Sequence, residues 1–196
     1  DPLEPQAFPV RLWDVFGQAG HPVRATVEGM GSLLLSRLLD LNETQSGILA
    51  IVFKVAQEKD WPLIDLKDLQ SLLKEVYEHS SKYSAHYGNI TKQSVGAIQR
   101  SLLVLEEEGA DQFFGEPALD LNDFMQVDAS GRGYINILSA TKLFHSPKLY
   151  STFLIWMLSR LFETLPEVGD PEKPKLVFFF DEAHLLFKDA SKLFLE

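Results

Sequence analysis

Hydrophobic positions change their spacing along the chain, and these changes divide it into three zones. Short β-rich runs at 10–15 and 23–27 are separated by glycines and a proline, which predicts two strands around a turn. From about 33 to 109, apolar residues recur with the period of a helix. From 133 onward, strand-like and helix-like runs alternate, a pattern typical of a parallel sheet with crossover helices.

The middle zone predicts a small four-helix subdomain. After a first helix at about 31–40, Asn42 with Gln45 forms a capping box that should start the second helix. Asp65 is a suitable N-cap for the third, and the fourth is expected at about 91–108. The Ser- and Tyr-rich segment before the fourth helix is predicted to be a loop, although its two histidines and three tyrosines could also suggest a metal or base-stacking site.

The last zone ends in the most informative segment. A buried strand is predicted at 133–138, followed by a long helix that Ser146 and Pro147 should start. A proline-rich connector then leads into the unbroken apolar run 176–180, which two carboxylates follow. An apolar run without alternation indicates a strand covered on both faces, and open α/β sheets bind ligands at the carboxyl ends of such strands.

Two neighbouring acids at the end of a buried strand suit the chemistry of a P-loop ATPase. The first acid holds Mg²⁺, usually through water, and the second activates the water that attacks the γ-phosphate of ATP. We therefore predict Asp181 as the magnesium ligand, Glu182 as the catalytic residue, and both as binding the ATP cofactor. The alternative is that the two acids merely end a buried strand at the surface.

Composition narrows the classes of function. The chain is 45% hydrophobic and 23% charged, as expected of a globular protein, and its net charge of −10 argues against a surface that coats nucleic acid. The absence of cysteine excludes disulfides and thiolate metal sites. No apolar run approaches the roughly 20 residues that span a bilayer. The opening residues lack a secretory pattern, so we expect a cytoplasmic protein without a membrane span.

The run 176–187 resembles the Walker B motif of the HerA/FtsK superfamily of RecA-like motors. The stretches 8–17, 109–117 and 131–138 resemble the YjgR-type branch of HerA-like ATPases, so the resemblance covers nearly the whole chain. It implies an ATP-binding, ATP-hydrolysing motor of the helicase or translocase class that forms a homo-oligomer, with a hexamer as the expected form. DNA is the polymer that HerA and FtsK relatives move, but the acidic composition here does not support it.

The implied fold class is α/β: part of a RecA-like P-loop NTPase core with an inserted all-helical subdomain. Residues 1–32 would supply core strands, 33–126 the helical subdomain, and 127–196 the part of the core with the Walker B strand. A phosphate-binding loop needs a Gly-Lys pair, which this sequence does not contain. The resemblance places that loop upstream of residue 1 and the sensor strand and arginine finger downstream of residue 196, so this segment alone is not expected to turn over ATP.

Several alternatives remain open at this stage. The segment could serve as an oligomerisation or partner-docking module without catalytic activity of its own. The residues 181–184 also spell the signature of DEAH-box helicases, although the flanking text favours HerA. His184 could couple nucleotide state to neighbouring elements or simply begin the next turn. A faint calcium-loop pattern at 128–139 is rejected, because Arg132 occupies a ligand position and Ser139 stands where a bidentate glutamate is needed.

Overall fold

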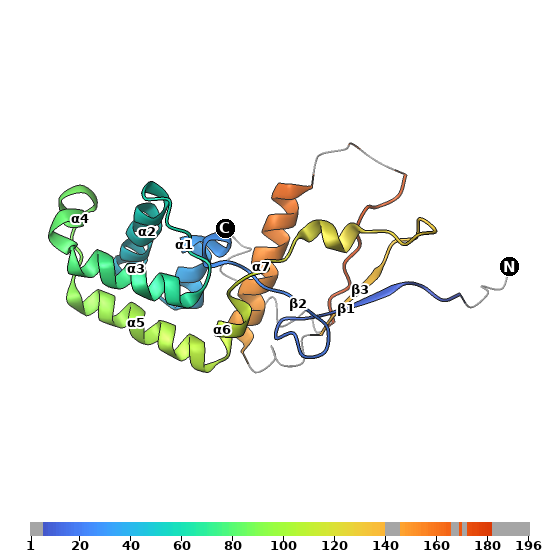
Figure 1. Cartoon of the computed structure of the whole chain (residues 1–196), viewed down its shortest axis with the longest axis horizontal. Helices are drawn as coiled ribbons and strands as arrows, with labels where there is room; N and C mark the ends of the chain where they lie inside the picture. The colour runs from blue at the N-terminus through green and yellow to red at the C-terminus, as the bar shows by residue number, and fades with distance from the viewer. Residues whose placement is uncertain (1–5, 140–145, 166–168, 170–171, 182–196) are drawn as a thin grey trace. The chain divides into compact units, whose positions relative to one another are not determined.

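The computed structural model describes residues 6–139, 146–165, 169 and 172–181. The chain forms two compact units, one made of residues 1–23 and 119–196 and the other of residues 24–118 (Figure 1). The limits expected for the helical subdomain were 33 and 126. The helical unit starts earlier because Thr26 caps a helix that begins at the next residue, with its hydroxyl oxygen accepting from Gly29 N–H at 2.9 Å.

The unit of residues 24–118 is helical. Its helices are α1 Val27–Leu38, α2 Glu43–Glu58, α3 Leu66–Glu78, α4 Ser80–Tyr87, α5 Lys92–Glu107 and α6 Ala110–Phe113 (Figure 1). The predicted loop before α5 is wrong, since the segment forms α4. Tyr83 is buried, and the Tyr87 hydroxyl donates to a Glu58 carboxylate oxygen on α2 at 2.6 Å, so packing against α2 orders this segment.

Side-chain caps start these helices where the sequence predicts them. The Asn42 side chain accepts from Gln45 N–H at 3.0 Å, and the Gln45 side chain accepts from Asn42 N–H at 3.1 Å, which confirms the capping box. Asp65 accepts from the backbone of Asp68 at 2.9 Å, and Thr91 caps α5. Each cap satisfies backbone N–H groups that the first helical turn leaves without partners.

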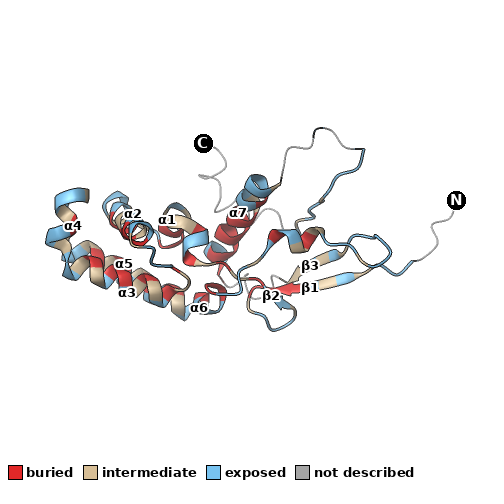
Figure 2. Ribbon diagram, turned by 45° about the horizontal axis from the view of Figure 1, so that its top comes forward, coloured by how far each residue is buried: buried red, intermediate tan, exposed pale blue. Residues whose placement is uncertain are grey.

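The core of the helical unit lies where α2, α3 and α5 face one another (Figure 2). The apolar positions predicted to point inward are buried, except that Ile51 is only half-buried, which confirms the helical periodicity. Burying a side chain of this size stabilises the fold by roughly 1.5–3 kcal/mol before entropy is counted. The fully buried members are Ile48, Leu49, Leu69, Leu73, Ile98 and Leu102.

The other unit contains a parallel sheet. Its strands are β1 Val10–Asp14, β2 His21–Pro22 and β3 Ile135–Ser139, in the order β2-β1-β3, together with the 3₁₀ helix η1 Leu121–Met125 and the helix α7 Pro147–Thr164. The fold is therefore mixed α/β with a three-stranded parallel sheet in the described residues. The strand expected at 23–27 is wrong: the strand lies at His21–Pro22, and Val27 already belongs to α1.

Gly20 allows the chain to pass close to the backbone of β1 just before β2 begins. A Cβ added at Gly20 would lie 2.5 Å from the carbonyl carbon and oxygen of Leu12, so no larger residue fits there. This close approach allows β2 to pair with the end of β1, with Trp13 opposite His21. The glycines between the two predicted strands therefore form a turn that brings β2 back beside β1 in the parallel direction, and not the turn of an antiparallel hairpin.

The two faces of the sheet differ. On one face the Trp13 indole N–H donates to the Asn136 side-chain oxygen at 2.9 Å, and the Trp13 ring meets Phe124 of η1 edge-on at 5.1 Å. On the other face the side chains of Val10, Leu12, Ile135 and Ile137 are exposed by about half. The prediction of a buried strand at 133–138 is wrong for β3, because among the described residues only one face of this strand is covered.

Candidate functional site

The apolar run Leu176–Phe180 is extended but pairs with no strand in the described part of the chain. Val177 is 56% exposed and Phe179 is 93% exposed, whereas Leu176 and Phe180 are partly covered. The expected buried strand is therefore absent from this structure. A strand needs hydrogen-bonding neighbours along its backbone, and the three described strands pair only with one another.

Asp181 follows this run and is exposed. Its charge acts on Tyr150, near the start of α7: burial raises the pKa of the Tyr150 hydroxyl above its usual value, and the Asp181 carboxylate raises it further. The structure thus brings Asp181 close to the first turn of α7, a relation that the sequence did not indicate. The predicted residues Glu182 and His184 lie outside the described residues.

A second acid lies at the carboxyl edge of the sheet. Asp14 ends β1, is 5% exposed, and is in register with Ser139 at the end of β3. Its carboxylate accepts from the backbone N–H groups of Phe16 at 3.0 Å, Gln18 at 2.8 Å and Ala19 at 2.9 Å. Asp14 therefore holds the turn after β1. Sequence reasoning missed it, although an aspartate three residues before a glycine at a strand end signals such a turn.

A family model, that of the HerA-like helicase C-terminal domain, matches residues 1–196. The chain belongs to this family. Searches of curated proteins and of solved structures gave no match. The match confirms the resemblance to the HerA family and covers the whole chain.

Metal ligands in this HerA-like chain can be sought only among its described side chains. The described residues contain no group of three or more His, Asp or Glu side chains that could hold a metal. Mg²⁺ usually keeps several waters and takes only one or two carboxylates, the remaining ligands being phosphate oxygens. Asp181 has one exposed carboxylate, a donor of the type that Mg²⁺ takes.

The loop at 128–132 is a turn and not an ion site. Asp128 accepts from the Ser130 hydroxyl at 2.6 Å and from Arg132 N–H at 2.9 Å, so its oxygens serve the loop itself. These hydrogen bonds, that of the Ser130 side chain first, lower the pKa of Asp128 to about 2. The Asp128 carboxylate stabilises the turn that leads into β3.

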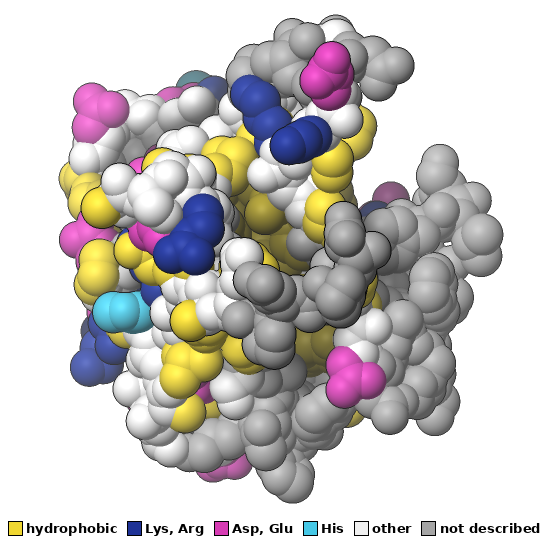
Figure 3. Space-filling model, turned by 90° about the vertical axis from the view of Figure 1, so that its right-hand side faces the viewer, with side chains coloured by type: hydrophobic (Ala, Val, Ile, Leu, Met, Phe, Trp, Pro, Cys, Tyr) yellow, Lys and Arg dark blue, Asp and Glu magenta, His cyan; other side chains and the backbone are white. Residues whose placement is uncertain are grey.

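No helix in the described part of the HerA-like chain has the length and apolar character needed to cross a membrane. Hydrophobic side chains nevertheless reach the surface at several places on the side drawn in Figure 3. Among the described residues, exposed hydrophobic side chains occur on one face of β1 and β3 and in the run before Asp181.

Proposed function

We propose that this chain supplies the Walker B half of the ATP-hydrolysing site of a HerA-like, RecA-type motor. The observation that carries the proposal is the five-residue apolar run that ends in Asp181 and Glu182, within a chain that the HerA-like family model matches throughout. Hydrophobic strands that end in two acids place charge at the ligand-binding edge of an α/β sheet.

Exposure of the apolar run supports the assignment. Removing apolar surface from water is worth about 25 cal/mol per Å², so a run with Val177 and Phe179 exposed gains from added sheet neighbours. In the proposed motor, Leu176–Phe180 becomes an inner strand of a larger parallel sheet. Its pairing would direct the Asp181 carboxylate toward the carboxyl edge of that sheet.

Each acid has a separate role in this proposal. Bound Mg²⁺ and ATP supply the charge neutralisation and the reactive phosphate. Asp181 positions Mg²⁺ through a water molecule, and Glu182 orients the attacking water and accepts its proton. The sequence has no Gly-Lys pair, so other polypeptide must provide the phosphate-binding loop. Residue His184 would link the occupied site to the following turn.

The proposed assembly is a homo-oligomer, with a hexamer as its expected form and the YjgR-type branch as its place in the family. A ring of RecA-like subunits places the nucleotide between neighbours, so turnover would need a phosphate-binding loop that these 196 residues do not contain, together with groups from a neighbouring subunit. DNA is a candidate substrate. Because the whole chain carries a net charge of −10, binding to DNA phosphates would need a local surface rich in Lys and Arg.

The test compares Glu182→Gln with Glu172→Gln in the intact protein. Glu172 is exposed in the connector before the apolar run and serves as the matched control. We expect Glu182→Gln to lower Mg²⁺-dependent ATP hydrolysis by at least about a hundredfold while ATP binding survives, because loss of the catalytic carboxylate removes general-base assistance of 10²–10⁴.

Two results would decide against the catalytic role. If Glu182→Gln hydrolyses ATP at the rate of the control, the residue does not activate water. If neither protein hydrolyses or binds ATP with Mg²⁺, the chain acts as a docking module, the second function that its exposed apolar face favours.

A further inference from the structure

One face of α5 carries a stripe of exposed residues around the half-buried Gly96 that the helical core does not use. The stripe is basic at the start of the helix and acidic at its end, with a glycine and a leucine between. Because i, i+4 and i+7 positions share a helix face, these residues lie in one row. Its members are Lys92, Gly96, Gln99, Leu103 and Glu107, with Arg100 beside them.

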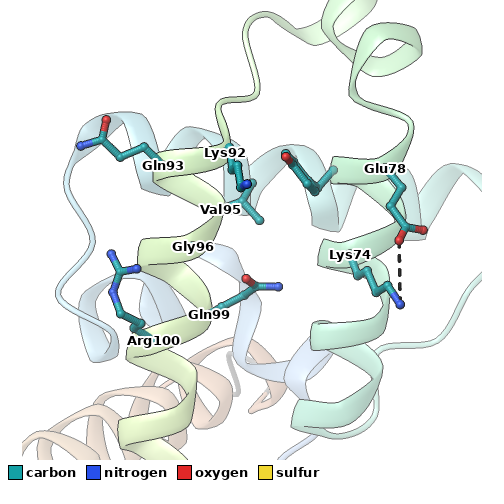
Figure 4. Close-up of a pocket in the computed structure, with 9 residues that line it drawn as sticks. Lys74, Glu78, Lys92, Gln93, Val95, Gly96, Gln99 and Arg100 are labelled. Atoms are coloured by element: carbon teal, nitrogen blue, oxygen red, sulfur yellow. Dashed lines mark ion pairs between the residues drawn. The ribbon is translucent and has the colours of Figure 1, made fainter.

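A groove opens beside Gly96, between α3 and α5. It has a volume of about 530 Å³, and Tyr77, Val95 and Gly96 contribute apolar surface to its lining. In Figure 4, Lys92 and Gln99 lean from α5 toward α3, whereas Arg100 extends away from α3, next to the face that carries Gly96. Gly96 lies between these side chains and leaves the backbone of α5 open.

Nothing within the helical unit requires glycine at 96. A Cβ added there would meet only the Arg100 guanidinium, at an ordinary 3.5 Å. Glycine destabilises the interior of a helix relative to alanine, and no contact within the helical unit compensates for this loss of stability. Glycine on a helix surface allows another backbone or a large side chain to approach closely.

The same helix carries the matching projection. Leu103 and Val104 are each 54% exposed, about two helical turns beyond Gly96. In the described part of the chain, Lys92 and Glu107 form no ion pair, although Lys74 and Glu78 pair across one helical turn at 3.8 Å. The stripe thus combines a groove at Gly96, the exposed side chain of Leu103, and the opposite charges of Lys92 and Glu107.

We propose that α5 pairs antiparallel with α5 of a second copy of this chain. With the twofold axis between positions 99 and 100, Leu103 of each copy faces Gly96 of the other, and Lys92 faces Glu107. Gln99 then faces Arg100, whose guanidinium donates to the amide oxygen. Each contact occurs twice, as an isologous interface demands.

Charge complementarity identifies the occupant of the groove as a second copy. The chain carries a net charge of −10, so two copies repel unless opposite charges meet locally. The antiparallel arrangement joins a basic end to an acidic end at both extremes of the helix pair. A parallel arrangement would place Lys92 against Lys92 and Glu107 against Glu107.

A charge-exchange series tests the pairing. Sedimentation equilibrium of the 196-residue chain by itself should show a self-association that Lys92→Glu and Glu107→Lys each weaken by at least about tenfold, because each single change creates two like-charge contacts. The double variant Lys92→Glu/Glu107→Lys should restore the dimer. Circular dichroism checks that all three variants keep their helices.

Cysteine cross-linking gives an independent measurement, because the natural chain contains no cysteine. Arg100→Cys lies beside the proposed axis and should give a covalent dimer with a short bismaleimide. Ala50→Cys, exposed on α2, is the matched control and should remain monomeric. A chain that sediments as a monomer at all concentrations, a dimer indifferent to both single charge changes, or failure of the double variant to restore it would overturn the proposal.

Discussion

Asp14 offers the sharpest test of how the sheet is held together. The substitution Asp14→Asn keeps the shape of the side chain but replaces one of its two acceptor oxygens with an NH₂ group. The carboxylate accepts three backbone N–H groups at 2.8 to 3.0 Å, two of them at one oxygen. The single amide oxygen of asparagine can accept from the N–H groups at only one of the two carboxylate positions. At the other position its NH₂ group would face a backbone N–H, and two donors cannot form a hydrogen bond.

The expected cost follows from those hydrogen bonds. A hydrogen bond to a charged group contributes about 1.5–3 kcal/mol, and a buried donor left unpaired costs about 1–3 kcal/mol. Asp14 is 5% exposed, so water cannot replace the lost acceptor fully. We expect the free energy of unfolding to fall by roughly 2–4 kcal/mol, a large share of the 5–15 kcal/mol typical of a domain.

Urea denaturation followed by tryptophan fluorescence measures this change. A Trp61→Phe background leaves Trp13 and Trp156, both in the unit that contains Asp14, to report the transition. The midpoint should fall while the urea dependence stays constant. The exposed Glu172→Gln serves as the control for loss of one negative charge. If Asp14→Asn lowers the free energy of unfolding by less than about 0.5 kcal/mol, the carboxylate does not hold the turn.

Three further predictions concern local electrostatics and capping. The pKa of Asp128 in the folded protein is about 2, below the unperturbed value of 3.8. The ionised carboxylate therefore stabilises the fold fully above pH 3.8, and this stabilisation is lost as the pH falls through about 2. NMR titration of the Asp128 carboxyl carbon measures the pKa, which Ser130→Ala should raise. Asp181→Asn should lower the pKa of the Tyr150 hydroxyl, because it removes the negative charge that raises this pKa while the burial of Tyr150 stays the same. Ultraviolet absorbance of tyrosinate against pH measures the change. An unchanged pKa would mean that the two side chains are not close. Asn42→Ala should lower the free energy of unfolding by about 1 kcal/mol in thermal denaturation, and no change would contradict the capping box.

Local rules determined much of the helical unit. Asn42, Asp65 and Thr91 start helices because a short polar side chain satisfies N–H groups only a few residues away. The helix from Pro147 likewise begins where the sequence indicates, since proline suits a first helical turn. Interactions that reach only four residues along the chain can be read from sequence. The family could be recognised for a similar reason, because motif residues lie close together.

Contacts between distant residues decided the rest. The Ser- and Tyr-rich segment became α4 because Tyr83 and Tyr87 found partners on other helices, which no local pattern reveals. Leu176–Phe180 reads as an inner strand, yet strand pairing depends on neighbours far away in sequence, and the described chain offers none. The approach of Asp181 to Tyr150 and the turn held by Asp14 also depend on the folded path. Sequence alone therefore determined where helices start, which helical positions are apolar and which family the chain belongs to. Tertiary structure decided which side chains meet, because burial and strand pairing are properties of the whole fold.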